Sequence, residues 1–209
     1  MSSCCNTPGT GDGYRPDQRF RRVLWAVLAI NATMFVVELA SGLAAHSVSL
    51  QADALDFLGD SANYALTLMV LGMSMRWRSG AALVKGGTMG LFGIGVIGQA
   101  LWNLHAGTLP GAMVMGTVGG LALTANLVSA ALLFAFRQGD SNMRSVWLCS
   151  RNDAIGNVAV MLAAAGVYGS GSAWPDLLVA AVLASLAISA SFVVLRQALG
   201  ELRLAAAAE

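Results

Sequence analysis

The chain has 209 residues, of which 56% are hydrophobic and 11% are charged, and its formal net charge is +1. Its mean hydropathy of +0.67 is far above that of a soluble domain of this length, which excludes a water-soluble globular protein. No nucleophile with a base, phosphate loop or basic nucleic-acid surface is recognisable, so we expect neither enzymatic catalysis nor nucleic-acid binding.

Six apolar stretches follow one another, each near the roughly 20 residues that cross a hydrocarbon core. They begin near Val23, Leu50, Ala82, Gly111, Ser145 and Trp174. We therefore predict an all-α integral membrane protein with six transmembrane helices. Its predicted parts are a flexible cytoplasmic segment over 1–22, a six-helix transmembrane domain over 23–198 and a short cytoplasmic tail over 199–209.

Basic residues occur before the first span, in alternate connections and after the last span. Arg76, Arg78 and Lys85 are assigned to the connection between the second and third spans, Arg137 and Arg144 to the connection between the fourth and fifth, and the three other connections contain no lysine or arginine. By the positive-inside rule both termini are cytoplasmic, and an even number of spans agrees with this. The expected location is the cytoplasmic (inner) membrane of a bacterium, with the lipid bilayer as solvent.

Polar residues begin ahead of the first span and continue inside it. Cys4 and Cys5 are adjacent near the predicted cytoplasmic terminus, where they could pass on a soft metal or, more simply, belong to a disordered segment without a fixed role. Within the span, Asn31 and Glu38 share one helical face. They could line a transport path or hydrogen-bond to neighbouring helices.

The second span, LQADALDFLGDSANYALTLMVLGM, carries the most intramembrane charge. Asp53, Asp56, Asp60 and Asn63 follow at spacings of three, four and three, so at about 100° per residue they form one narrow stripe. Three like charges in the membrane repel unless some are protonated, hydrated or paired with a cation. The stripe therefore indicates a site for a cation or for protons.

Glycines recur in the third and fourth spans and allow helix backbones to approach closely. Gly90, Gly93, Gly95 and Gly98 lie in the third span. Packing within one chain is the simpler interpretation, and a homodimer held by transmembrane helices is the alternative.

The fifth span carries a second polar stripe formed by Cys149, Asn152, Asp153 and Asn157. The second and fifth spans run in opposite directions, and Asp60 and Asp153 both fall near the bilayer midplane at about 1.5 Å per residue. Carboxylates suit a hard or borderline divalent ion, and a thiol favours zinc or cadmium. A tetrahedral site of Asp56, Asp60, Asp153 and Cys149 is therefore reasonable, although a lone buried cysteine is often only a small hydrophobic residue.

These residues resemble the cation diffusion facilitators, a family of six-helix metal-ion/proton antiporters. The similarity runs from about Val23 to Arg196 and is strongest along MFVVELASGLAAHSVSLQADALDFLGDSANYALTL, with further likeness in NDAIGNVAVMLAA and WPDLLVAAVLASL. Asp56 and Asp60 match the paired ligands of the family's second helix, and Asp153 matches the acidic ligand of its fifth.

The chain also departs from the family pattern. Cys149 stands where the family commonly has histidine, and Asp56 stands where many zinc-selective members have histidine. The segment RQGDSNM lacks the histidines of the corresponding loop in many members, and the cytoplasmic domain through which many members dimerise does not follow the sixth span. Metal preference therefore stays open, and a dimer would have to be held by the helices.

The resemblance implies secondary-active efflux of a divalent transition metal of the zinc, cadmium, cobalt or iron class, zinc foremost, in exchange for protons. The metal is the transported substrate, and no prosthetic group is expected. Proton-carrying or supporting roles are predicted for Asp53, Glu38, Asn31, Asn152 and Asn157. A metal-binding accessory or sensor protein that transports nothing, and a proton-coupled carrier of an organic cation, are the alternatives.

Overall fold

A computed structural model describes residues 18–69, 75–136 and 141–207, which form six α-helices and no strand. The helices are α1 (Gln18–Ala44), α2 (Val48–Met69), α3 (Met75–Ala106), α4 (Ala112–Phe134), α5 (Ser141–Ser170) and α6 (Trp174–Ala207). The all-α prediction is confirmed. Cys4 and Cys5 lie outside the described residues, and α6 continues through most of the segment predicted as a tail.

Four helical segments of the described part are long and apolar enough to cross a membrane. They are Gln18–Ala44, Ser79–Ala106, Ala112–Phe134 and Trp174–Arg203, which belong to α1, α3, α4 and α6. The two helices that do not qualify, α2 and α5, are the ones that carry Asp53, Asp56, Asp60 and Asp153. Polar groups in a span lower its hydropathy, which accounts for the absence of α2 and α5 from this set. The protein is an all-α membrane protein, and the count of six spans stays a prediction.

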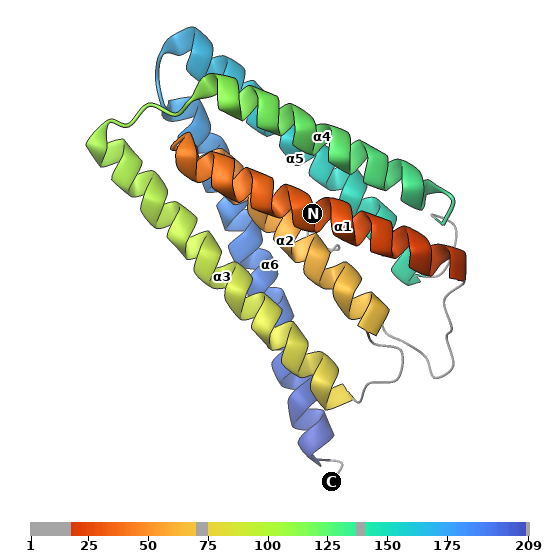
Figure 1. The fold of residues 1–209 in the computed structure, drawn as a ribbon. Coiled ribbons are helices and arrows are strands. Elements are labelled where there is room, and N and C mark those ends of the chain that lie inside the picture. Colours follow the sequence, from red (N-terminus) through yellow and green to blue (C-terminus); the bar gives the residue numbers. More distant parts are fainter. Residues whose placement is uncertain (1–17, 70–74, 137–140, 208–209) are drawn as a thin grey trace.

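Helix α2 lies at the centre of the bundle and packs against α1, α3, α5 and α6 (Figure 1). Around it, α3 pairs mainly with α6, while α4 pairs mainly with α5 and also contacts α1. A helix surrounded in this way exposes little of its surface to lipid. The acidic helix therefore occupies the position where neighbouring helices can best shield its carboxylates.

Two ends of the bundle can be distinguished by charge. One end contains the start of α1, α3 and α5 and the finish of α2, α4 and α6. Arg19, Arg21 and Arg22 of α1 and Arg196 and Arg203 of α6 lie toward it, and we call it the arginine end. The positive-inside rule predicts that this end faces the cytoplasm.

Lys85 does not belong to a connection, and its assignment there was wrong. The structure places it in the third turn of α3, where the side chain is only 8% exposed. Helix α3 begins at Met75, several residues before the apolar stretch that marks it in the sequence. A basic residue just inside an extended helix is indistinguishable, in the sequence, from one in the loop before it.

Close helix packing explains the glycines of α3. A Cβ atom on Gly90 would lie 2.6 Å from the Ser191 hydroxyl oxygen, and one on Gly93 would lie 2.8 Å from Ile188, both on α6. Ser191 also donates a hydrogen bond to the Gly86 carbonyl across this contact. Packing within one chain is thus confirmed for these two glycines, whereas Gly95 faces no atom within 4 Å.

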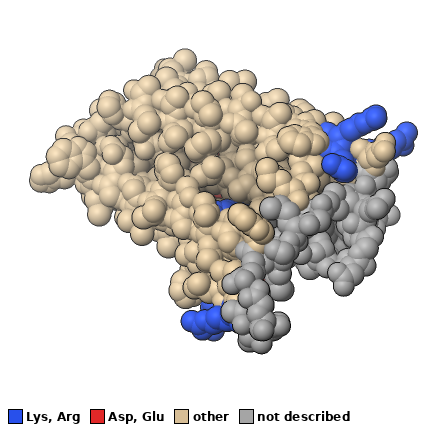
Figure 2. Space-filling model, turned by 60° about the horizontal axis from the view of Figure 1, so that its bottom comes forward, with Lys and Arg blue, Asp and Glu red and all other residues tan. Residues whose placement is uncertain are grey.

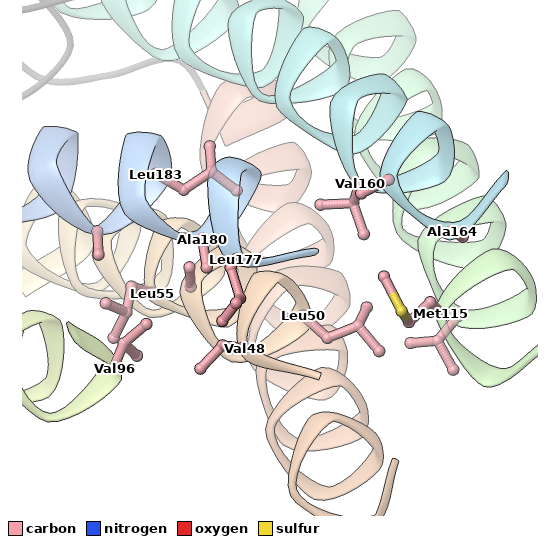
Figure 3. Close-up of a cluster of buried hydrophobic side chains, with 14 of the residues drawn as sticks. Val48, Leu50, Leu55, Val96, Met115, Val160, Ala164, Leu177, Ala180 and Leu183 are labelled. Carbon is pink, nitrogen blue, oxygen red and sulfur yellow. The ribbon is translucent and has the colours of Figure 1, made fainter. Parts of the chain in front are cut away.

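The largest apolar core lies in the half of the bundle away from the arginine end. Side chains from α2, α3, α4, α5 and α6 point toward one another there (Figure 3). Its members include Val48, Leu50, Leu55, Val96, Met115, Val160, Leu177 and Leu183. Such packing excludes water, so this half of the bundle is closed between α2 and the other helices.

Asp176, in the first turn of α6, fixes the start of α2 from across the bundle. Its buried carboxylate accepts hydrogen bonds from the backbone N–H groups of Val48 and Ser49, at 2.9 and 3.1 Å, and from the hydroxyls of Ser47 and Ser49. These N–H groups have no partner within α2 and carry the positive end of its dipole. Asp176 therefore acts as an N-cap supplied by another helix.

Replacing Asp176 with alanine should destabilise the folded protein by about 2–4 kcal/mol, because four buried donors lose a charged acceptor. Thermal unfolding in detergent would measure this, and Asp176→Asn, which keeps one acceptor oxygen, should lose less. Ser185→Ala, an exposed change further along α6 whose hydroxyl bonds only a carbonyl of its own helix, is the matched control. An equal melting temperature for Asp176→Ala and Ser185→Ala would contradict the capping role.

Candidate cation site

The predicted stripe on α2 lies at graded depths in the protein. Asp53 is 1% exposed and Asp60 is 7% exposed, whereas Asp56 and Asn63 are partly exposed. All four fall within about a quarter of the helix circumference, as the spacing of three, four and three requires. The stripe is therefore directed into the bundle, with its acidic groups held away from lipid.

Asp60 is the best-connected carboxylate of the stripe. Its oxygen accepts a hydrogen bond from the hydroxyl of Tyr64, one turn further along α2, and the carboxyl group of Asp153 of α5 lies close enough to interact with it. Two carboxyl groups can share a hydrogen bond only when one carries a proton. When both are ionised, a cation between them is needed to offset their repulsion. Asp60 and Asp153 thus form a place for a positive charge.

Of the other two predicted ligands, Asp56 does not form a group of three with this pair. Asp56 is partly exposed and its charge acts on Glu38 of α1. The side chain of Cys149 lies outside the described residues, as does that of Asn152. Among the described side chains, no three histidine, cysteine or acidic groups lie close enough together to hold a metal ion. Repulsion keeps like-charged carboxylates apart unless a cation lies between them.

A second acidic pair joins α1 to α2. Glu38 is fully buried and interacts with the carboxyl group of Asp53 at hydrogen-bonding range. Neither Glu38 oxygen, nor Oδ2 of Asp53, has a hydrogen-bond donor. The two observations agree, since two ionised carboxylates have only acceptors to offer each other. One proton shared by the pair would supply the missing donor.

Close approach of the two helices brings this pair together. A Cβ atom on Gly42 of α1 would lie 3.0 Å from the Gln51 side chain of α2. Glu38 precedes Gly42 by one turn and Asp53 follows Gln51, so the antiparallel helices place their carboxyl groups side by side. Asp53 precedes Asp60 by two turns of α2, so the pair lies on the side of Asp60 that is away from the arginine end.

The predicted asparagines differ in their surroundings. Asn31 is buried and its amide donates a 2.8 Å hydrogen bond to the Val27 carbonyl of its own helix. Asn157 is fully buried, and neither its nitrogen nor its oxygen has a hydrogen-bond partner in the protein. Asn157 follows Gly156, whose Cβ atom would lie 3.8 Å from Oδ1 of Asp53. An amide with both ends unpaired next to an acidic pair is suited to bind water or a cation.

Lys85 contributes a positive charge to the stripe. Its ammonium donates a hydrogen bond to Oδ1 of Asn63, and its charge acts favourably on the Asp60 carboxylate. The sequence shows a lysine ten residues into a helix of mainly apolar composition, yet its contact with α2 cannot be read from spacing alone. Lys85 is therefore a site residue that the sequence interpretation missed.

The comparisons with known proteins agree with this arrangement. Residues 24–203 match the model of the cation efflux transmembrane domain, which is most of the chain. The chain belongs to the cation efflux family. It is also 23% identical over 206 residues to the metal cation efflux system protein CzcD of Cupriavidus metallidurans, and to the same degree to the cation efflux system protein CzcD of an Alcaligenes species.

The match covers 93% of this chain and 65% of each relative, so the chain spans about two thirds of the length of these proteins. Membership in the cation efflux family confirms the resemblance seen in the sequence. The apolar helices and the bacterial relatives support an integral protein of the inner membrane.

Tyr64 and Asp176 were also missed as residues that hold the candidate cation site and its helix α2 in place. Tyr64 follows Asp60 by four residues, the spacing at which helical side chains meet, so its hydroxyl was a detectable partner. Asp176 lies inside the segment WPDLLVAAVLASL that carries the family likeness, but its carboxylate oxygens accept hydrogen bonds from the start of another helix, α2. A local sequence pattern gives no signal for such a contact.

The contact between Asp60 and Asp153 predicts cross-linking between α2 and α5. With the three native cysteines replaced by serine, Asp60→Cys combined with Asp153→Cys should react with a short bifunctional thiol reagent and so resist later maleimide labelling. Asp60→Cys with Ile155→Cys is the control, because Ile155 is 63% exposed on another side of α5. Equal maleimide labelling of both pairs would show that the two aspartates do not face each other.

Proposed function

We propose that this protein is a secondary-active transporter that exports a divalent transition-metal cation from the cytoplasm in exchange for protons. The ligands would be Asp56, Asp60 and Asp153, with Cys149 as a candidate fourth. The observation that carries the proposal is the contact between Asp60 and Asp153, because two carboxyl groups from oppositely directed helices meet inside an apolar bundle. Membership in the cation efflux family supports it.

The donor set suits the zinc class of ions. Three carboxylates supply hard oxygen ligands, and one thiolate would shift preference toward zinc or cadmium. Metal binding requires deprotonated ligands, so a proton arriving at the same groups weakens binding. Because metal and protons compete for the same ligands, their movements in opposite directions are coupled at one site.

The packing of the bundle supports access from the arginine end. The large apolar core closes the opposite half, whereas Asp56 and Asp153 keep part of their surface exposed. Figure 2 turns the lower side of Figure 1 forward and shows basic surface at its edges and a smaller basic patch inside a hollow. A site open on one side and closed on the other is what alternating access requires.

The Glu38–Asp53 pair would serve as a proton carrier beside the metal site. Among the described residues, the charged groups that act on Glu38 are Asp53 and Asp56, and both are acidic. A proton shared by Glu38 and Asp53 removes one charge from the membrane interior and supplies their missing donor. Because the pair lies on the outward side of Asp60, a proton entering from outside would reach it before the metal ligands.

Proteoliposomes with a trapped fluorescent indicator test the transport proposal. We expect zinc or cadmium flux driven by a pH gradient, and at least roughly a 100-fold loss with Asp153→Asn, because one charged ligand disappears. Cobalt, nickel, manganese and iron(II) complete the panel. Glu201→Gln is the matched control, since it removes a carboxylate near the arginine end of α6 that is hydrogen-bonded to Ser79 of α3.

Flux by the folded, inserted wild type that survives in Asp153→Asn would refute the ligand set. Metal binding without flux would point to an accessory or sensor protein. Competition by an organic cation without any metal transport would indicate a carrier of organic cations.

Glu38→Gln tests the proton carrier. The amide can donate a hydrogen bond to Asp53 permanently, so we expect metal binding within about threefold of wild type but a flux that no longer responds to the pH gradient. Met34→Leu, one turn away on the buried face of α1, controls for packing. A wild-type response to the pH gradient in Glu38→Gln would exclude this role.

A further inference from the structure

We propose that Lys85 is a built-in counter-cation of the metal site, whose fixed positive charge lowers the site's affinity for metal and matches it to divalent ions. The inference rests on the proposed function, because it assigns a role to a residue beside the same carboxylates. It goes beyond that proposal by naming a positioning and specificity-determining residue on a third helix, α3.

Helix packing fixes where the ammonium lies. Helices α2 and α3 approach closely at Gly59, where a Cβ atom would lie 3.0 Å from the methyl carbon of Met89. The two helices are antiparallel, so one turn closer to the arginine end Asn63 of α2 faces Lys85 of α3. The lysine ammonium donates a hydrogen bond to the asparagine side chain there. Gly59 and Asn63 flank Asp60, so this register brings the lysine head beside that carboxylate.

The electrostatic evidence agrees with this placement. Lys85 is 8% exposed, so bulk water screens its charge poorly. Its positive charge acts directly on Asp60, in addition to the hydrogen bond from Tyr64 and the interaction with Asp153. A buried ammonium is too costly to keep without an opposite charge, and Asp60 supplies one.

Charge balance gives the lysine a function. The three carboxylates proposed as ligands and one ammonium leave a net charge of −2 among these four groups, which a divalent cation neutralises. A monovalent ion would leave a negative charge in the low-dielectric interior, and a trivalent ion would leave a positive one, both of which are unfavourable. Without Lys85 the same ligands would attract any cation more strongly.

The same charge assists release. When the metal departs, the ammonium continues to stabilise Asp60, so the empty site is less unfavourable than three bare carboxylates would be. Very tight binding slows turnover, because a carrier must let its substrate leave at each cycle. Lys85 thus lowers affinity in favour of turnover.

The experiment compares Lys85→Met with Lys85→Arg in the full-length protein. Zinc binding is measured by titration calorimetry in detergent, and zinc flux is measured in proteoliposomes. Lys85→Met keeps the unbranched shape and most of the length of the side chain but removes the charge, so we expect zinc to bind at least about tenfold more tightly and to turn over more slowly. Lys85→Arg keeps the charge and should bind zinc within about threefold of wild type.

Met89→Leu is the matched control, since it alters the same face of α3 one turn away without changing charge. Size-exclusion profiles and melting temperatures show whether each variant is folded. If Lys85→Met does not fold, Lys85→Gln replaces it, with the same expected gain in affinity.

The outcomes separate this inference from the proposed function. Tighter zinc binding by Lys85→Met, with Lys85→Arg and Met89→Leu near wild type, supports the counter-cation. Unchanged or weaker binding by Lys85→Met, while the wild type binds zinc, overturns the counter-cation and leaves the transporter proposal intact. Absence of zinc binding in both the wild type and Lys85→Met overturns both.

Discussion

The cost of placing carboxylates in a low-dielectric interior governs the architecture of this protein. Asp53, Asp56 and Asp60 on one face of α2 cannot point into lipid, and the bundle answers by surrounding α2 with four other helices. Asp60 and Asp53 each interact with different neighbouring side chains. Asp60 has Tyr64, Asp153 and the charge of Lys85, and Asp53 has Glu38. The contacts around α2 lower the free-energy cost of keeping an acidic helix inside a membrane.

Much of this could be predicted from the sequence. Hydropathy predicts the membrane class and the order of the helices, and the spacing of Asp53, Asp56 and Asp60 places them on one face because helical geometry is local. The meeting of Asp60 and Asp153 follows from counting along two oppositely directed spans. Such inferences are possible from a sequence because they depend only on positions along single helices and on the fixed thickness of a bilayer.

Contacts set by helix packing could not be predicted in this way. The pairing of Glu38 with Asp53 depends on the close approach at Gly42, and the reach of Lys85 to Asn63 depends on the register at Gly59. Nothing in a single sequence specifies which helices become neighbours or how they slide along each other. Lys85 was also misplaced because the positive-inside rule treats every basic residue near a span as part of its connection, without regard to where the helix begins.

The cap that Asp176 provides has a consequence for motion. Four hydrogen bonds join the first turn of α6 to the start of α2, in the half of the bundle that must open for an ion to leave on that side. Separating α2 from α6 there would strand buried donors and a buried carboxylate together. The two helices should therefore move together. The exit should widen at the outer end of the contact between α2 and α5, where Leu50, Val160 and Ala164 belong to the apolar core and can part without breaking hydrogen bonds.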